Sequence, residues 1–565
     1  MKRNFTKIPV LALGLILSTT VLNSCVKDDD VSITEPTRYT SNDVKSYADL
    51  FKIFWTVMDQ RYNYFYEQKR QDGMDWNAIY REYYPKFLAL KSYGKTGFTD
   101  RDIQTEAEKA AEYFTDIIDP IMDRHFSLQV ALPYSNTDTN LTNTFVFRGG
   151  MKSKKNNIYN FGLKYGYMKY QLGTDAVSQN YTLPNNKGTF TYLMGSLKSS
   201  PDIYYFTFNR FALSSTVKII LADKYLSPDP GNNLVLTQTD IENSTELNAI
   251  KDVNFRNKVK NFTISILNQW NAFPTSTEIK AFNEQVSIFK NTETVSDTFI
   301  DASQKALSKS KNLVAYNDGA TYAPVLTTES LPYIQWFANR MATHAQWGYR
   351  LPQFQNDAQG IIDKAPFYKQ FLNPLYKGKI KKLILDLRGN SGGDVMDARF
   401  FTDRFITKSS VWGYQRTKEG NGQFNYTPWI PMQVNPHRFG IPSNIPIVIL
   451  TDKGSYSMAE MSTMMIKTQG TQTVSIGDYS AGATAGLTGS DEFNGGSQDM
   501  VAGVMQFYMP VMATKDSKGE VIEGVGIKPD IYLTPPTDLE VAAMKSSPKT
   551  FRDRVIDKAT EYLSK

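Results

Sequence analysis

The strongest constraint on the fold is a rhythm of short aliphatic runs in the C-terminal half of the chain. The runs "KKLILDL", "IPIVILTD" and "TVSIGD" each end in turn residues, and helix-sized segments separate them. This rhythm is typical of an α/β sheet whose strand ends carry loops. The sequence therefore predicts an α/β core whose loops present the functional residues.

The length of 565 residues predicts two to four structural units rather than one core. Apolar residues at helical spacing indicate a helical N-terminal unit over 41–130, and short runs between Asn, Gly and Ser clusters indicate a β-rich segment over 131–200. We expect the α/β catalytic domain over 201–535, with a polar helical insertion at 214–377. A C-terminal helix is predicted for 536–565, so the fold class is multi-unit α/β (α+β).

The start of the chain has the pattern of a secretory signal over 1–24. A basic beginning is followed by an apolar run and by small or polar residues before Cys25. The ending "LNSC" resembles a bacterial lipobox, in which cleavage precedes the cysteine and the thiol is lipidated. An ordinary signal with an incidental cysteine is the alternative. Cys25 is the only cysteine of the sequence, so the chain forms no internal disulfide.

A polar, acidic stretch follows, and 25–40 is predicted to be a disordered tether. A lysine followed by acids directly after the cysteine resembles the signal that exports some lipoproteins to the outer face of the outer membrane. A solvated linker is the alternative interpretation. We therefore expect a lipid-anchored protein of the cell envelope, in the outer membrane and exposed at the surface if the export signal is read correctly.

Two motifs at strand ends could carry chemistry. "LILDLRGNSGGD" (Leu383 to Asp394) is a glycine-rich turn whose backbone N–H groups can point into a cleft, but it lacks the Lys-Ser/Thr ending of a phosphate loop. A structural turn is its alternative interpretation. "GSYSMAE" (Gly454 to Glu460) follows about sixty residues later at the end of another strand, where a serine could act as a nucleophile.

Together, "LDLRGNSGG", "GSYSMAE" and "GDYSAGATAG" resemble the tail-specific, or C-terminal processing, serine peptidases of family S41 and their tricorn-like relatives. Further likenesses lie in the N-terminal helices, including "IMDRHFSL", and in "IEGVGIKPDIYL" and "RDRVIDKATEYL" near the C-terminus. The resemblance covers about half of the chain. It implies a catalytic core with the fold of ClpP and crotonase. Many relatives also carry a PDZ domain, so the β-rich segment could be a degenerate form of one, although it shows no clear carboxylate-binding signature.

The resemblance implies that Ser457, three residues before Glu460, is the nucleophile and that Ser455 is a turn residue. The backbone N–H groups of Met458 and Gly392 would stabilise the oxyanion. Tail-specific peptidases use a lysine as the base, but Ala483 stands at the matching position here. A Ser-Lys dyad of the usual spacing is therefore absent.

The tricorn-like branch instead uses a histidine from the helical N-terminal unit and a glutamate before the last strand. His125 and Glu523 match these positions, which implies a general base and its orienting carboxylate. In that branch a serine precedes the histidine, whereas this chain has Arg124, whose guanidinium cannot accept a hydrogen bond. The two remaining histidines, His344 and His437, are interpreted as structural or surface residues.

Other functional classes have less support. The net charge of +6 falls to +3 without the three cations of the signal, which is too little to indicate nucleic-acid binding. The distant histidines and single cysteine do not indicate a zinc site, and we expect no cofactor. Asp386 and Arg388 are interpreted as a structural ion pair. The expected partner is a protein or peptide substrate. The lipid anchor is expected to attach the protein to a membrane, and the sequence predicts no oligomeric state.

Two alternatives to a serine endopeptidase remain at this point. The replacements at Arg124 and Ala483 are compatible with an inactive S41-like binding lipoprotein. An aromatic-rich, lipid-anchored chain of this length is also compatible with a nutrient-binding lipoprotein of the outer membrane. Because proteins of that second kind are mostly helical, it predicts helix throughout Lys381 to Tyr532.

Overall fold

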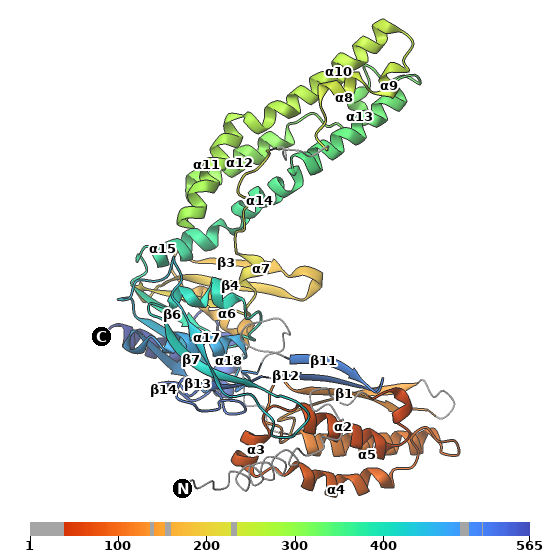
Figure 1. Ribbon diagram of the computed structural model, residues 1–565. Helices are drawn as coiled ribbons and strands as arrows, with labels where there is room; N and C mark the ends of the chain where they lie inside the picture. Colours follow the sequence, from red (N-terminus) through yellow and green to blue (C-terminus); the bar gives the residue numbers. More distant parts are fainter. Residues whose placement is uncertain (1–38, 136–140, 153–159, 228–233, 486–495, 511) are drawn as a thin grey trace, which may run out of the picture. The chain divides into compact units, whose positions relative to one another are not determined.

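The computed structural model describes residues 39–135, 141–152, 160–227, 234–485, 496–510 and 512–565 (Figure 1). The chain divides into two compact units. The first contains 1–152, 415–430 and 485–513, and the second contains 153–414, 431–484 and 514–565. The predicted signal, Cys25 and most of the predicted tether lie outside the described residues.

The first unit combines helices with a four-stranded antiparallel sheet of order β11-β12-β1-β2. Its helical elements are η1 (Ser41–Asp43), α2 (Tyr47–Arg61), α3 (Phe65–Asp72), α4 (Trp76–Ala89) and α5 (Asp100–Ile118). Its strands are β1 (Ser127–Pro133), β2 (Thr142–Arg148), β11 (Gly496–Val501) and β12 (Met505–Pro510).

Aromatic side chains hold these helices against the sheet of the first unit. The ring of Phe54 on α2 lies 5.2 Å from that of Phe114 on α5 and 6.3 Å from that of Phe507 on β12. Phe114 lies 5.4 Å from Phe147 on β2. Helices α2, α4 and α5 begin where a polar side chain caps them: Ser46 accepts the N–H of Asp49 at α2, for example. The predicted helical N-terminal region is thus confirmed.

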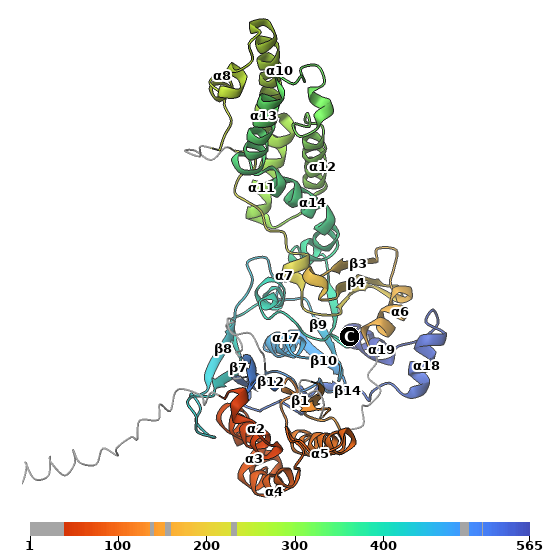
Figure 2. The ribbon, with the colours of Figure 1, turned by 90° about the vertical axis from the view of Figure 1, so that its right-hand side faces the viewer.

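The second unit contains a seven-stranded sheet of order β14-β10-β9-β6-β5-β4-β3 (Figure 2). Strands β5, β6, β9, β10 and β14 run parallel, and β3 and β4 add antiparallel strands at one edge. The bounds are β3 (Val177–Thr182), β4 (Thr189–Leu197), β5 (Ser200–Phe208), β6 (Lys382–Asp386), β9 (Ile447–Thr451), β10 (Thr473–Gly477) and β14 (Ile531–Tyr532). The aliphatic runs of the sequence form β6, β9 and β10, which confirms the predicted α/β core.

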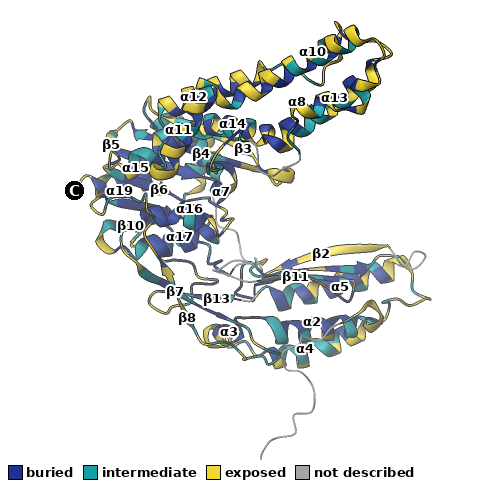
Figure 3. Ribbon diagram, turned by 45° about the horizontal axis from the view of Figure 1, so that its top comes forward, coloured by how far each residue is buried: buried dark blue, intermediate teal, exposed yellow. Residues whose placement is uncertain are grey.

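Helices α6 (Phe161–Gln171), α18 (Asp538–Ser546) and α19 (Arg554–Leu563) pack on this sheet. Their core residues, such as Tyr167, Met544 and Ile556, join Ile384, Val448 and other strand residues in one buried cluster. Helix α17 (Met458–Lys467), which follows the serine motif, contacts β10 and is buried along its length (Figure 3). Smaller elements are η2 (Pro184–Asn186), α16 (Asp397–Phe400), η7 (Thr402–Phe405) and η8 (Gly470–Gln472).

A third sheet has the order β13-β7-β8, and the chain passes from one unit to the other within these strands. Their bounds are β7 (Ser410–Thr417), β8 (Ile430–Val434) and β13 (Met512–Asp516). The strands between Lys381 and Tyr532 contradict the nutrient-binding alternative, which predicts helix there.

The insertion between β5 and β6 is helical, as predicted, and its longer helices pack against one another. It contains α7 (Leu213–Thr216), α8 (Gln238–Glu242), α9 (Thr245–Asn248), α10 (Val253–Ala272), η3 (Phe273–Thr275), α11 (Thr277–Thr292), α12 (Asp297–Lys311), η4 (Gly319–Tyr322), α13 (Leu331–Thr343), η5 (His344–Gly348), α14 (Leu351–Phe367), η6 (Tyr368–Leu372) and α15 (Asn373–Tyr376). The segments η5 and η6 are π-helical. Among the described helices, none is long and apolar enough to span a membrane.

One element of the predicted β-rich segment is wrong. "FGLKYGYMKYQ" forms helix α6, because Asn160 caps it by accepting the N–H of Leu163 at 3.0 Å. Lys164, Tyr167 and Met168 then bury one helical face. The limits 131–200 also differ from the structure, since β1 and β2 belong to the first unit and β3 to β5 to the second. The predicted C-terminal helix is two helices, α18 and α19.

Candidate active site

The loop between β9 and α17 contains the one serine of the motif with a strained backbone. Ser457 has φ +53° and ψ −115°, directly before the first residue of α17. A left-handed φ in a residue with a Cβ costs about 1–3 kcal/mol and persists only where the surroundings enforce it. Hydrolases use such sharp strand-to-helix turns to present a nucleophilic hydroxyl. We call Gly454–Ser457 the serine turn.

Ser455, the other serine of the motif, is fully buried and structural. Its hydroxyl donates to the carbonyl oxygen of Leu387 at 2.9 Å and accepts the N–H of Asp452 at 3.1 Å. Both hydrogen-bonding roles of the hydroxyl are therefore in use. Ser457, by contrast, is partly exposed. The geometry agrees with the choice of Ser457 over Ser455.

Glu460 holds the backbone of the serine turn in place. This buried carboxylate accepts the N–H of Ser457 at 3.0 Å and that of Ala483 at 2.8 Å through Oε2. Its Oε1 accepts the Ser480 hydroxyl at 2.6 Å and the N–H of Gly482 at 2.7 Å. Glu460 served only as a reference point in the sequence, yet it joins the helix to the segment that contains Ala483.

The glycine-rich turn, Gly389–Gly393, is called the glycine loop and lies against the serine turn. A Cβ added at Gly392, where φ is +71°, would fall 2.5 Å from the carbonyl oxygen of Tyr456 and 2.6 Å from Ser457 Cβ. Only glycine fits this close approach.

The N–H of Gly392, however, donates to Asn390 Oδ1 at 2.9 Å, which differs from its predicted role as an oxyanion donor. Within the described part of the chain, no acceptor pairs with the N–H of Gly393 or of Met458. The glycine loop therefore offers Gly393, and the start of α17 offers Met458 as predicted. Positive helix N-termini favour negative charge, which suits an oxyanion beside Met458.

Two further residues from the sequence analysis, Ala483 and Glu523, also belong to the second unit. The N–H of Ser457 donates to the carbonyl oxygen of Ala483 at 2.9 Å, so Ala483 is the direct neighbour of the serine. Glu523 is fully buried, and its Oε2 accepts the N–H and the hydroxyl of Thr484 at 2.8 and 3.0 Å.

His125 belongs to the first unit and lies just before β1. Asp123, which sequence reasoning missed, accepts the N–H groups of His125 and Phe126 at 2.8 and 3.0 Å and fixes this turn. Burial lowers the pKa of His125 to about 4 and raises the pKa of Asp123. Arg124 Nη1 donates to the carbonyl oxygen of Ile121 at 3.2 Å.

The other histidines have structural contacts: His344 accepts the N–H of Leu236, and His437 accepts that of Phe439.

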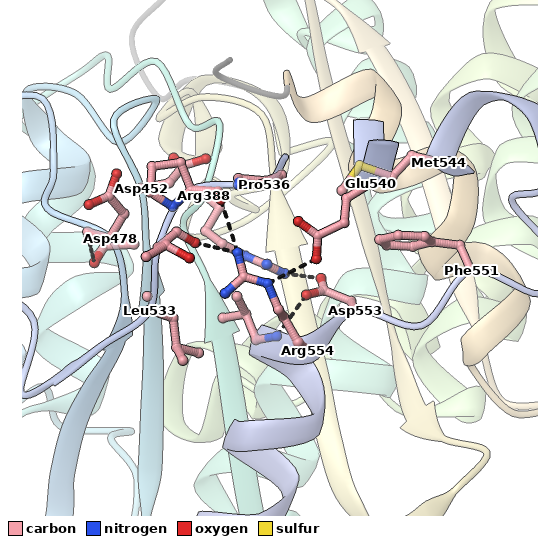
Figure 4. A pocket seen from close by; sticks show the side chains of 15 residues that line it. Arg388, Asp452, Asp478, Leu533, Pro536, Glu540, Met544, Phe551, Asp553 and Arg554 are labelled. Carbon is pink, nitrogen blue, oxygen red and sulfur yellow. Dashed lines mark hydrogen bonds and ion pairs between the residues drawn. The ribbon is translucent and has the colours of Figure 1, made fainter. Parts of the chain in front are cut away.

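Asp386 and Arg388 form a buried ion pair with an Nη2 to Oδ2 distance of 2.7 Å, which confirms their structural interpretation. Arg388 also pairs with Asp553, and Lys164 Nζ lies 3.2 Å from Asp386 Oδ1. Beside this network lies a small pocket at the ends of β9 and β10 (Figure 4). Its labelled lining residues include Arg388, Asp452, Asp478, Glu540, Asp553 and Arg554.

The family model described as peptidase family S41 matches residues 348–533 of the chain. These residues belong to peptidase family S41. The S41 region contains the glycine loop, the serine turn, Ala483 and Glu523, whereas His125 precedes it. The protein is accordingly a serine-type peptidase.

Solved structures give weaker likenesses to this chain. A candidate peptidase from Parabacteroides merdae is 14% identical, with 92% of this chain and 97% of that chain covered and a TM-score of 0.44. Mature CPAF complexed with lactacystin is 9% identical, covering 92% and 98%, with a TM-score of 0.40. The photosystem II D1 C-terminal processing protease is 20% identical, covering 32% and 43%, with a TM-score of 0.22. No curated protein matches the sequence.

Proposed function

We propose that this S41 peptidase is a serine endopeptidase that cleaves proteins or peptides through an acyl-enzyme. Ser457 is the nucleophile, His125 the general base and acid, and Glu523 the residue that orients His125. The strained serine turn at the start of α17 is the observation that carries the proposal, because it singles out Ser457 next to backbone N–H groups that have no acceptor among the described residues. The N–H groups of Met458 and Gly393 receive the oxyanion.

Each group in this proposal has a defined share of the chemistry. Neutral His125 removes the Ser457 proton as the hydroxyl oxygen attacks the substrate carbonyl, and then returns it to the leaving amine. A water molecule releases the acyl group by the same route in reverse. A positioned base contributes on the order of 100- to 10,000-fold in rate, and one oxyanion donor about 100- to 1,000-fold.

Purified mature protein should hydrolyse an unfolded protein such as casein, and Ser457→Ala should abolish this activity. His125→Gln should lower kcat by at least about 100-fold, because it removes the base. The matched control is His437→Gln, which changes a histidine that the site does not use. Full activity of Ser457→Ala would refute the proposal.

The proposal requires the imidazole of His125 to come within hydrogen-bond reach of the Ser457 hydroxyl. A disulfide tests this without any activity measurement, since the native sequence has a single cysteine at position 25. In a protein that starts after Cys25, the double variant His125→Cys/Ser457→Cys should crosslink under mild oxidation, as detected by intact mass. The pair His437→Cys/Ser457→Cys serves as the control and should stay reduced.

One alternative keeps a specific observation in its favour. Ala483 lies beside Ser457 where the tail-specific branch has its lysine, which is compatible with an inactive S41-like binding protein. A serine-directed phosphonate decides between the two. Labelling of Ser457 supports the peptidase, and a wild-type protein that resists labelling and leaves casein intact supports the binding protein.

We further propose that the protein is a lipoprotein anchored in the outer membrane through Cys25. The lipobox-like ending before Cys25 supports this location. Cells fed labelled palmitate should label the wild-type protein, and Cys25→Ala should remove the label. Protease added to intact cells distinguishes surface exposure from a periplasmic orientation, since only exposed protein is digested.

A further inference from the structure

Asp452, the buried residue directly after β9, joins the two loops that form the site. Its Oδ1 accepts the N–H of Gly389 at 2.9 Å and the N–H of Gly454 at 2.9 Å. Gly389 begins the glycine loop and Gly454 begins the serine turn. One carboxylate oxygen is therefore the shared acceptor for the two segments that supply the oxyanion donors and the nucleophile.

The two backbones are in direct contact at this carboxylate. A Cβ added at Gly454 would fall 2.9 Å from Gly389 Cα and 3.1 Å from Asp452 Oδ1. Two more hydrogen bonds hold the serine turn here: the N–H of Tyr456 donates to Asn390 O of the glycine loop at 3.0 Å, and Ser455 Oγ donates to Leu387 O, just before that loop, at 2.9 Å. A shift of the glycine loop at this point would displace the N–H of Gly393 relative to Ser457.

The second oxygen of Asp452 has a different environment. The side chain is 6% exposed, and Oδ2 has no hydrogen-bond partner among the described residues. Asp452 lines the pocket of Figure 4, which has room for about one water molecule, ≈ 20 Å³. The charged groups around it are Lys164 of α6, Arg388 after β6, Asp478 after β10, and Glu540, Asp553 and Arg554 on the far wall.

We propose that Asp452 is a positioning residue of the peptidase: its carboxylate clamps the glycine loop to the serine turn and so sets the oxyanion donors at the correct distance from Ser457. This inference rests on the proposed function. An ionised carboxylate forms hydrogen bonds about twice as strong as those of a neutral acceptor, so protonation loosens the clamp. Burial raises the pKa of Asp452 to about 6, against the hydrogen bond from Gly389 and the charges of Lys164 and Arg388, which lower it.

The variant Asp452→Asn tests the clamp, because it keeps an oxygen for the two N–H groups and removes the charge. We expect kcat to fall by roughly tenfold or more, short of the ~100- to 1,000-fold typical of a lost oxyanion donor. KM should stay within about twofold, since the substrate-binding surface is unchanged. The rate of Ser457 labelling by a phosphonate should fall in parallel with kcat.

The pH profile of kcat separates this role from a purely structural one. Wild-type activity should decline below about pH 6 as Asp452 takes up a proton, and Asp452→Asn should lack this decline. Asp530→Asn is the matched control: Asp530 accepts the N–H of Ser475 at 2.8 Å in the same unit but touches neither loop. It should keep the wild-type kcat and profile.

The outcomes distinguish this inference from the proposed function. A wild-type kcat in Asp452→Asn, or a decline that stays at pH 6, would overturn the clamp. Retained activity in Ser457→Ala would instead overturn the serine mechanism itself. Asp452→Ala should lower kcat further than Asp452→Asn; if it does not fold, the isosteric asparagine variant still decides the question.

Discussion

The backbone N–H of Ser457 donates to the carbonyl oxygen of Ala483 at 2.9 Å. The position at which the tail-specific branch carries its lysine is therefore beside the serine, although this chain has a methyl group there. The side chain of Ala483 is 1% exposed. A lysine at this position would be desolvated, which lowers its pKa toward the range of a useful base.

The first prediction follows from this contact. In an inactive His125→Ala background, Ala483→Lys should restore activity at least tenfold, within the ~100- to 10,000-fold that a positioned base contributes. The restored activity should be greatest above neutral pH, because the lysine must be neutral to accept a proton. Hydrolysis of a fluorogenic casein checks this, with Ala481→Lys in the same background as the control. A folded double variant no more active than His125→Ala would contradict the prediction.

A second prediction concerns Gly392. It separates the cost of a left-handed backbone from the cost of a side-chain collision. Gly392 and Gly470 have the same φ of +71°, but a Cβ at Gly470 meets nothing within 4 Å. Gly470→Ala should therefore lower the free energy of unfolding only by the cost of a left-handed backbone, about 1 kcal/mol. Its activity should stay unchanged. Gly392→Ala should lose more stability and nearly all activity, because its Cβ would collide with the serine turn. Melting temperatures and kcat/KM of the two variants measure the difference; equal effects would contradict it.

The sequence predicted the parts of the site that have local signals. Aliphatic runs ended by turn residues predicted β6, β9 and β10, and the family resemblance implied Ser457 rather than Ser455 through its spacing to Glu460. The residues that the sequence did not reveal have partners far along the chain. Asp452 accepts a hydrogen bond from Gly389, which lies 63 residues earlier in the sequence, and no local pattern predicts such a bond.

Two errors have local physical causes. The segment of helix α6 is predicted to be β-structure because short runs alternate there with Asn, Gly and Ser clusters, whereas a cap at Asn160 and one buried face decide its conformation. Gly392 is the predicted oxyanion donor, but its N–H donates to Oδ1 of Asn390, two residues earlier. Asn side chains often accept a hydrogen bond from a nearby backbone N–H. An Asn at that spacing is the local signal that the N–H of Gly392 would already be paired.

A third prediction concerns the pH range over which His125 can act as a base. Burial lowers the pKa of His125 to about 4, below its ordinary value of 6.5. A histidine accepts a proton only when neutral, so His125 stays competent down to about pH 4. Once Asp452→Asn removes the decline near pH 6, the remaining acid limb of kcat/KM should lie near pH 4. An acid limb near 6.5 in that variant would show that the catalytic imidazole is not the buried one described.

The last prediction concerns acid stability through Asp386. Burial alone would raise the pKa of Asp386, but Arg388 and then Lys164 outweigh it and lower the pKa from 3.8 to about 2. Because the folded-state pKa is the lower one, the ionised carboxylate stabilises the fold fully above pH 4, and this stabilisation is lost as the pH falls toward 2. The shift corresponds to about 2 kcal/mol.

Urea unfolding of the wild type and of Asp386→Asn at pH 6 and pH 2.5 measures this effect. The difference in unfolding free energy between the two proteins should be smaller at pH 2.5, by most of that ~2 kcal/mol. Asp202→Asn is the control, since Asp202 pairs with Lys382 at the surface and should show no measurable pH dependence. A difference that stays constant between the two pH values would mean that Arg388 and Lys164 do not hold Asp386 in its ionised form.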